Sequence, residues 1–221
     1  MRRARRLIYL EDQYLWSKRV ADLFARAMAD NPDLHLIAVV PRYPDVDGRF
    51  SLPPNLVGRQ QAIDACRAAD PERVHIFTVA PASIVANVID DVWATVGSDN
   101  LNRRSWTHDS ELSCAVLDET ERFARDLRLR LIRAHLDRAA DGSEDDGLVD
   151  LAAVVKTIAD SARALDEWYV NGRNGSRPPG RLRPHAPEKL GLLTRLWAEP
   201  AYRAFYDPDG RSYRMRLTGE L

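Results

Sequence analysis

The chain has 221 residues, of which 45% are hydrophobic, and its 32 basic and 33 acidic residues give a formal net charge of −1. This length suits one α/β domain with an appendage, and the charge provides no global field toward nucleic acid or an anionic membrane. No run of about 18 apolar residues predicts a membrane span. The basic start leads directly into Glu11 and Asp12 rather than into an apolar signal region. We therefore expect a cytoplasmic chain without a transmembrane segment.

The first part of the chain alternates apolar runs with helical patterns. The predicted elements are a strand at 7–10, a helix that Ser17 caps and that ends near residue 30, a strand at 34–40, a helix at 56–69 and a strand at 73–79. The run at 34–40 is almost continuously apolar, which is typical of a strand covered on both faces. A loop rich in Pro, Gly and Asp follows it at 41–55, where open α/β sheets commonly place binding sites.

Strands at 84–89, 92–96 and 112–117 come next, followed by a long amphipathic helix at 119–139. This order predicts an α/β fold with a mixed, largely parallel sheet flanked by helices. We divide the chain into a half-domain at 1–139, an acidic linker at 140–150, and a helical and irregular extension at 151–221 that is rich in Arg and Pro. The extension is expected to wrap back over the main domain.

The strongest functional signal is the loop that follows the strand at 92–96. It reads Gly97-Ser98-Asp99-Asn100. Glycine lets a backbone approach a ligand closely, and Ser and Asn side chains donate hydrogen bonds. Two arginines follow within a few residues, each with several guanidinium donors. The sequence therefore predicts a site for a phosphate oxyanion.

The spacing around this loop resembles the second half of the phospholipase D superfamily. The signature of that family is H-x-K, four residues, D, six residues, G-S-x-N, and a later glutamate. In that register stand Asp90, Gly97, Ser98, Asn100 and Glu111. The segment Ile-Tyr-Leu-Glu-Asp-Gln-Tyr at 8–14 is similar to the one that opens the second half of two-motif members, and the likeness extends over roughly residues 7–139.

The resemblance implies metal-independent cleavage of a phosphodiester, with no cofactor. A family histidine attacks phosphorus and forms a phospho-histidine, while a second histidine from the other half protonates the leaving alcohol. Lysine and asparagine neutralise the phosphoryl charge in the transition state. Carried over to this chain, Gly97, Ser98 and Asn100 would bind phosphate. Asp90 would be a structural hydrogen-bond partner, and Glu111 would hold the imidazole.

The segment that resembles the start of the second half also has an expected part in the site. Glu11, Asp12 and Gln13 follow the first strand directly. We expect these three residues to hold the phosphate-binding donors in place.

The reactive positions of the motif are changed. Counting back from Asp90 places Ser83 at the histidine position and Val85 at the lysine position. We expect His75, on the preceding strand, to stay away from the site, and His108 to form hydrogen bonds within its own loop. Losing a nucleophile together with a charge stabiliser costs several orders of magnitude in rate. No intact catalytic residue is therefore predicted.

The expected function is a phospholipase D-like domain of the phosphodiesterase family, with phospholipid or another phosphodiester as substrate class, that is inactive or very feeble alone. One alternative is a non-catalytic subunit that completes a split enzyme with a second half-domain or a second copy. Another is a pseudoenzyme that binds phosphate or phospholipid. A third is a misread gene, with the stretch 79–87 altered by a reading-frame error, which resequencing would decide. The near-neutral charge argues against nucleic acid as a partner.

Overall fold

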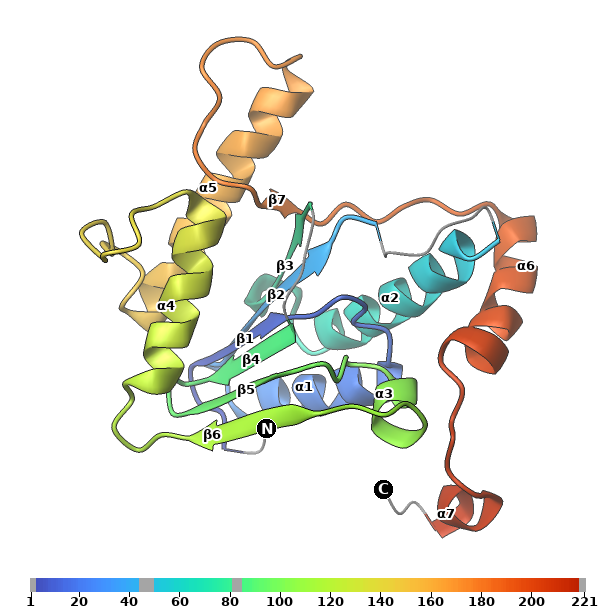
Figure 1. Cartoon of the computed structure of the whole chain (residues 1–221). Helices are drawn as coiled ribbons and strands as arrows, with labels where there is room; N and C mark the ends of the chain where they lie inside the picture. Colours follow the sequence, from blue (N-terminus) through green and yellow to red (C-terminus); the bar gives the residue numbers. More distant parts are fainter. Residues whose placement is uncertain (1–2, 44–49, 81–84, 219–221) are drawn as a thin grey trace.

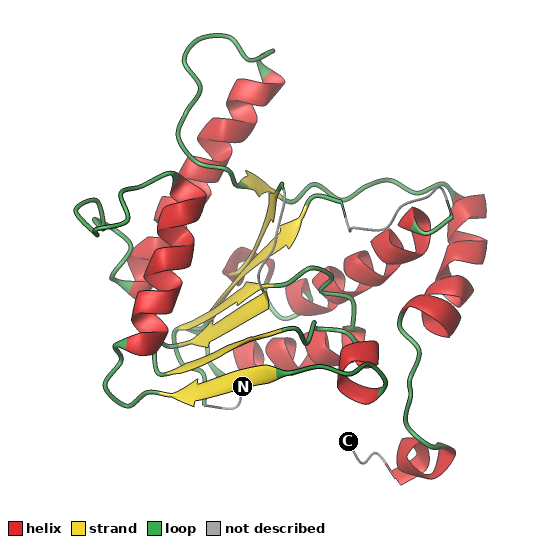
Figure 2. Cartoon of the chain, viewed as in Figure 1, coloured by secondary structure: helices red, strands yellow, loops and turns green. Residues whose placement is uncertain are grey.

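The structure is a computed structural model that describes residues 3–43, 50–80 and 85–218. Its described strands form one seven-stranded sheet in the order β6-β5-β4-β1-β2-β3-β7, with helices on both faces (Figures 1 and 2). The strands are β1 Leu7–Glu11, β2 His35–Pro41, β3 Val74–Val79, β4 Val85–Ile89, β5 Trp93–Gly97, β6 Ser113–Leu117 and β7 Arg183–Pro184. The helices are α1 Lys18–Asp30, α2 Leu52–Arg67, α3 Arg103–Thr107, α4 Phe123–Leu136, α5 Leu151–Val170, α6 Leu192–Ala201 and α7 Tyr213–Thr218, with a π-helical turn at Tyr202–Tyr206 after α6.

The central strand β1 is buried along its whole length and supplies side chains to two separate cores. Leu7 and Tyr9 pack in the core beneath α4 and α5. Ile8 and Leu10 pack in the core beneath α1 and α2. Because neighbouring side chains of a strand point to opposite faces, one apolar run fills both layers. The molecule is thus a sheet between two helical layers.

The predicted α/β class, with a mixed sheet flanked by helices, is confirmed. The parallel share is smaller than predicted, because among the described strand pairs β1–β2 and β2–β3 are parallel and four are antiparallel. Helical crossovers join β1, β2 and β3, whose pairs are parallel, whereas β4 and β5 are joined by a short turn that makes them antiparallel. The turn from β4 to β5 uses Asp90 and Asp91 at φ of 51° and 62°, the left-handed conformation that tight hairpin turns require.

The limits of the helices follow from local capping. The Ser17 side chain accepts a hydrogen bond from Val20 N and caps α1, as predicted. Helix α2 begins before the predicted residue 56 because prolines fit into the first turn of a helix. Helix α4 is shorter than the predicted 119–139. It starts after the turn made by Asp118 and ends where Asp137 takes a left-handed φ of 54°.

The core beneath α4 continues across residue 139. Val154 and Ile158 of α5 pack in the same cluster as Leu7 and Tyr9 of β1. Strand β7 also joins the sheet, with Pro184 opposite Phe77 of β3. The division at 139 and 150 stays a prediction. Among the described helices, none is both long and apolar enough to cross a membrane.

Candidate functional site: the loop after β5

Strand β6 approaches Gly97 so closely that no side chain fits at this position. A Cβ on Gly97 would lie 2.5 Å from Ser113 Cα and 2.6 Å from Leu112 O. Gly97 also pairs in register with Val85 of β4. From the sequence, Gly97 was predicted to let a ligand approach the backbone. The close packing of β6 requires a glycine at this position in any case.

The Glu111 carboxylate is bonded to two serine hydroxyls. Ser98 Oγ donates to Glu111 Oε2 at 2.6 Å, and Ser105 Oγ donates to Glu111 Oε1 at 2.7 Å. Ser98 Oγ also accepts a hydrogen bond from Leu112 N at 3.2 Å. The short helix α3 supplies Ser105, and the Asn102 side chain caps this helix by accepting from Ser105 N at 2.7 Å. The residue expected to hold an imidazole therefore holds two hydroxyls.

The other side chains of the loop add an acceptor-rich surface. Asn100 is buried and its Nδ2 donates to Ser98 O at 3.2 Å, so the side-chain donors of Ser98 and Asn100 both have acceptors within the chain. Burial raises the pKa of Asp99, and the neighbouring Glu111 carboxylate raises it further. Both carboxylates face a cavity of about 670 Å³ whose described cation, Arg211, is paired with Asp209. The two carboxylates therefore make this surface negative.

The aspartate, lysine and histidine positions of the motif correspond to Asp90, Val85 and Ser83. Asp90 accepts hydrogen bonds from Arg5 N, Arg6 N and Leu7 N at 2.6, 2.8 and 2.8 Å, so its carboxylate joins the β4–β5 turn to the start of β1. Val85 is a buried apolar side chain in β4, where no ammonium group is available. Ser83 lies outside the described residues.

Asp12 holds the end of the loop at Leu101, directly after Asn100. Its Oδ2 accepts from Leu101 N at 2.7 Å, and its Oδ1 accepts from Tyr14 N at 2.8 Å and Leu15 N at 2.6 Å. Burial raises the pKa of Asp12 from its ordinary 3.8 to about 6, although these hydrogen bonds and the nearby Arg59 act in the opposite direction. Asp12 thus contacts the loop at Leu101, while the expected phosphate-binding role of the loop stays a prediction.

Glu11 and Gln13 have other partners. Glu11 Oε1 accepts from Tyr9 Oη at 2.6 Å and lies 2.9 Å from His135 Nε2. The Gln13 carbonyl accepts from Arg59 Nη2 at 2.9 Å. The sequence interpretation did not single out His135. Its position on α4 gave no sign that it meets β1.

Neither of the other two histidines considered from the sequence joins the loop. His75 Nε2 lies 3.2 Å from His35 Nδ1 near the amino ends of β3 and β2, at the opposite edge of the sheet from the loop. Burial, and then the neighbouring His35, lower the pKa of His75 to about 4, which keeps it neutral. His108 is exposed at the end of α3, and its backbone N donates to Arg104 O at 2.8 Å. Within the described ranges, no group of three or more His, Cys, Asp or Glu residues is placed to hold a metal ion.

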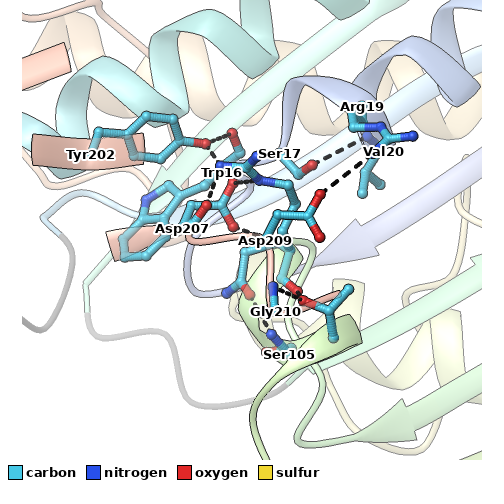
Figure 3. Close-up of polar contacts among 12 residues, drawn as sticks. Trp16, Ser17, Arg19, Val20, Ser105, Tyr202, Asp207, Asp209 and Gly210 are labelled. Atoms are coloured by element: carbon cyan, nitrogen blue, oxygen red, sulfur yellow. Dashed lines mark hydrogen bonds and ion pairs between the residues drawn. The ribbon is translucent and has the colours of Figure 1, made fainter. Parts of the chain in front are cut away.

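The C-terminal tail packs against the helix that follows the loop (Figure 3). The extension was expected to wrap back over the main domain, but the residues that make this contact were not predicted. The buried Asp207 carboxylate accepts from Arg103 N at 2.5 Å and from Arg103 Nε at 3.0 Å. The Tyr202 hydroxyl lies 2.9 Å from the same carboxylate, and Gly210 N donates to Thr107 Oγ1 at 2.9 Å. The turn-forming run Asp-Pro-Asp-Gly at 207–210 was the available signal.

No protein-family model matches the chain, and no curated protein matches its sequence. Its structure is similar to that of Nuc from Salmonella typhimurium, a phospholipase D family member, with 14% identity and a TM-score of 0.45 over 57% of this chain and 74% of Nuc. It is also similar to phosphatidylserine synthase from Haemophilus influenzae Rd KW20, with 13% identity and a TM-score of 0.48 over 76% of this chain and 42% of the synthase.

The alignment with the synthase thus covers less than half of that protein's length. The likeness is one of fold, a mixed sheet between helices. At these identities, any activity of this chain has to be argued from its own residues.

Proposed function

We propose that the chain is a half-domain of the phospholipase D superfamily that has no phosphodiesterase activity of its own. The observation that carries this proposal is the Glu111 carboxylate, which is bonded to the hydroxyls of Ser98 and Ser105. In an active relative this carboxylate would orient the imidazole that attacks phosphorus. Here it serves to connect the loop to α3.

The chemistry of the parent family explains why such a site does not turn over. Attack on a phosphodiester needs a nucleophile with a base, and cations must stabilise the charge that develops on phosphorus. Val85 supplies no charge at the lysine position, and Asp99 and Glu111 add negative charge where a phosphate would lie. Gly97, Ser98 and Asn100 remain the proposed phosphate contacts. Because their donors are already bonded to acceptors within the chain, we expect weak binding.

The test is an activity assay on the purified chain with phosphatidylcholine vesicles and with bis(p-nitrophenyl) phosphate. We expect no release of choline or nitrophenol above the buffer rate, and no phosphoryl adduct by intact-mass spectrometry. The variant Glu111→Gln is the control for a contaminating enzyme, because activity from a contaminant would be the same in the parent and variant preparations. Turnover by the parent chain that Glu111→Gln reduces would overturn the proposal.

A second candidate function is that of a non-catalytic subunit that docks on another phospholipase D-like half-domain. The observation that favours it is the edge strand β6. Leu112 and Leu117 are 84% and 72% exposed, and Val96 and Trp106 nearby are also partly exposed. Exposed apolar side chains along a sheet edge are typical of a surface that a partner covers.

Association is tested by size-exclusion chromatography with light scattering. The chain is measured alone and after co-expression with a separately encoded half-domain that contains the H-x-K motif. We expect a complex that Leu117→Glu disrupts while circular dichroism stays unchanged. A monomer at all concentrations that also fails to bind such a chain would exclude this candidate and leave the inactive half-domain as the proposal.

A further inference from the structure

A cavity of about 340 Å³ lies at the carboxyl ends of β2 and β3, and we call it the β2–β3 cavity. Figure 1 shows the chain after β7 running past these strand ends toward α6. The polar side chains that line the cavity include those of Arg42, Arg59, Gln60, Thr78, Arg183 and His185. Ligands of open α/β sheets bind outside the carboxyl ends of parallel strands, and this volume is at the lower end of the range for small-molecule sites. The cavity therefore has the position and the size of a small-molecule site.

Arg59 of α2 brings a buried positive charge to this cavity. The residue is 2% exposed, and its Nε, Nη1 and Nη2 donate to the carbonyl oxygens of Tyr14, Pro41 and Gln13 at 3.2, 2.8 and 2.9 Å. A guanidinium has five N–H donors, so two of them have no acceptor among the described residues. Burial lowers the pKa of Arg59 to about 10, although the more distant Asp12 carboxylate acts in the opposite direction. A buried cation held only by neutral carbonyls favours the approach of an anion.

Arg42 supplies a second guanidinium at the same edge of the sheet. It directly follows Pro41, whose carbonyl accepts from Arg59 Nη1, so both arginines belong to the end of β2. The Arg42 guanidinium lies 5.6 Å from the centre of the Tyr43 ring. Among the described residues, no carboxylate lies within ion-pair distance of Arg42 or of Arg59. Two arginines of one cavity therefore lack a counterion within the described chain.

The other charged groups of the lining leave an excess of positive charge. Arg183 is paired with Asp166, and Glu188 is the second acid among the described lining residues. Three arginines thus face two acids. His185 adds a buried Nδ1 without a hydrogen-bond partner. Burial, and then the charge of Arg59, lower the pKa of His185 to about 4, so its ring is neutral near pH 7 and available to bond a ligand.

Two unpaired guanidiniums from separate elements match a phosphate group better than a carboxylate. A carboxylate has two oxygens and one charge, which a single guanidinium satisfies. A phosphate monoester has three terminal oxygens and a charge of about −1.5 to −2 at pH 7, so it accepts from both arginines at once. Gln60 and Thr78 add an amide and a hydroxyl to the lining, which suits an ester with a small polar group.

We propose that the β2–β3 cavity binds a small phosphate monoester, with its phosphate group held between Arg42 and Arg59. The bound anion would compensate the buried charge of Arg59 and accept from its two remaining N–H groups. This site shares no residue with the loop after β5, so it does not rest on the proposed loss of phosphodiesterase activity.

The test is isothermal titration calorimetry of the full chain at low salt with glycerol 3-phosphate, inorganic phosphate and succinate. We expect glycerol 3-phosphate to bind most tightly and succinate most weakly. Arg42→Gln should weaken the binding of glycerol 3-phosphate by about tenfold, because it removes one charged donor group. Arg26→Gln is the matched control. It removes the same charge from an exposed arginine on α1 outside the cavity, and it should bind like the parent chain.

NMR spectroscopy shows where the ligand binds. Glycerol 3-phosphate should shift the ring resonances of His185 and leave those of His108, at the end of α3, unchanged. Circular dichroism checks that both variants keep the fold.

Four results would overturn this proposal. They are an absence of binding by both phosphate compounds, equal affinity for succinate, equal losses in Arg42→Gln and Arg26→Gln, or shifts at His108 instead of His185. The last result would place the ligand near the loop after β5. None of these results requires turnover of a phosphodiester, so this proposal and the proposed loss of activity fail separately.

Discussion

Arg128 is a fully buried guanidinium whose charge is matched by a single carboxylate. Its Nε and Nη2 lie 2.6 and 2.7 Å from the two oxygens of Asp91, and its Nη1 donates to Leu148 O at 2.7 Å. The pair joins α4 to the β4–β5 turn and to the loop before α5. A buried pair contributes little compared with an apolar core, but removing one partner leaves an uncompensated charge.

We predict that Arg128→Leu lowers the free energy of unfolding by about 3 to 5 kcal/mol, as measured by urea denaturation. Adding Asp91→Asn should recover part of the loss, because it removes the unpaired charge and asparagine tolerates the left-handed conformation at this position. Lys156→Ala is the control. It breaks an exposed pair on α5 and should leave the urea midpoint unchanged. Equal effects of Arg128→Leu and Lys156→Ala would contradict this account.

Asp12 should make stability depend on pH in an unusual direction. Its folded-state pKa of about 6 lies above its ordinary value of 3.8, so between these values the folded chain keeps a proton that the unfolded chain releases. The contribution of Asp12 to stability is therefore present below about pH 4 and is lost as the pH rises to about 6.

Asp12→Asn should remove this dependence. Between about pH 4 and about pH 7, the free energy of unfolding of the variant, measured relative to the parent chain, should rise by roughly 2 to 3 kcal/mol. Urea denaturation at both pH values measures this difference, and other titrating groups cancel in the comparison. Parallel pH profiles for the two proteins would show that Asp12 titrates normally.

At the scale of elements, the contact between α2 and the tail depends on a missing side chain. A Cβ on Gly58 would meet the Tyr202 ring, with Cδ2 and Cζ both 2.7 Å away. The Tyr202 hydroxyl lies 2.6 Å from Trp16 O, so the ring is held on its other side and has little freedom to move. Gly58 thus lets the end of the α6 segment lie directly on α2.

Gly58→Ala should destabilise the protein although alanine is the better helix former. The gain in helix propensity is about 1 kcal/mol at most, whereas overpacking costs about 1 to 3 kcal/mol. We expect a lower urea midpoint and faster hydrogen exchange at residues 202–207. In a Tyr202→Ala background, the same change should become stabilising. A higher midpoint for Gly58→Ala in the parent chain would refute this packing argument.

The sequence predicted the positions of helices and strands better than it predicted strand pairing and side-chain contacts. The apolar run of β2 and the Ser17 cap of α1 were readable because their signals are local. The antiparallel pairing of β4 and β5 was not, because the turn uses Asp90 and Asp91 instead of the usual glycine or asparagine. Spacing located the loop after β5. The bonds from Glu111 to serine, and from Asp207 to Arg103, join residues whose proximity no local pattern encodes.

At the scale of the whole molecule, the order of strands in the sheet differs from their order in the chain. Strand β1 pairs with β2 on one side and with β4 on the other. The β1-α1-β2-α2-β3 unit is contiguous in the chain. The other edge of β1 pairs with β4, which lies about 80 residues later. Long-range strand pairing is slow because loop-closure entropy has to be overcome first.

We therefore predict that refolding is stepwise. In pulsed hydrogen exchange after dilution from urea, amides that pair β4 with β5, strands adjacent in the chain, should become protected before those that pair β1 with β4. Simultaneous protection of these three strands would indicate a single cooperative step instead.

The central position of β1 also has a consequence during synthesis on the ribosome. Until β4 has left the exit tunnel, one edge of the fully buried central strand has open backbone donors and acceptors. An open apolar edge is the kind of surface that chaperones bind and that aggregates recruit. Yield of the folded chain should therefore depend on how quickly the ribosome delivers residues 85–89.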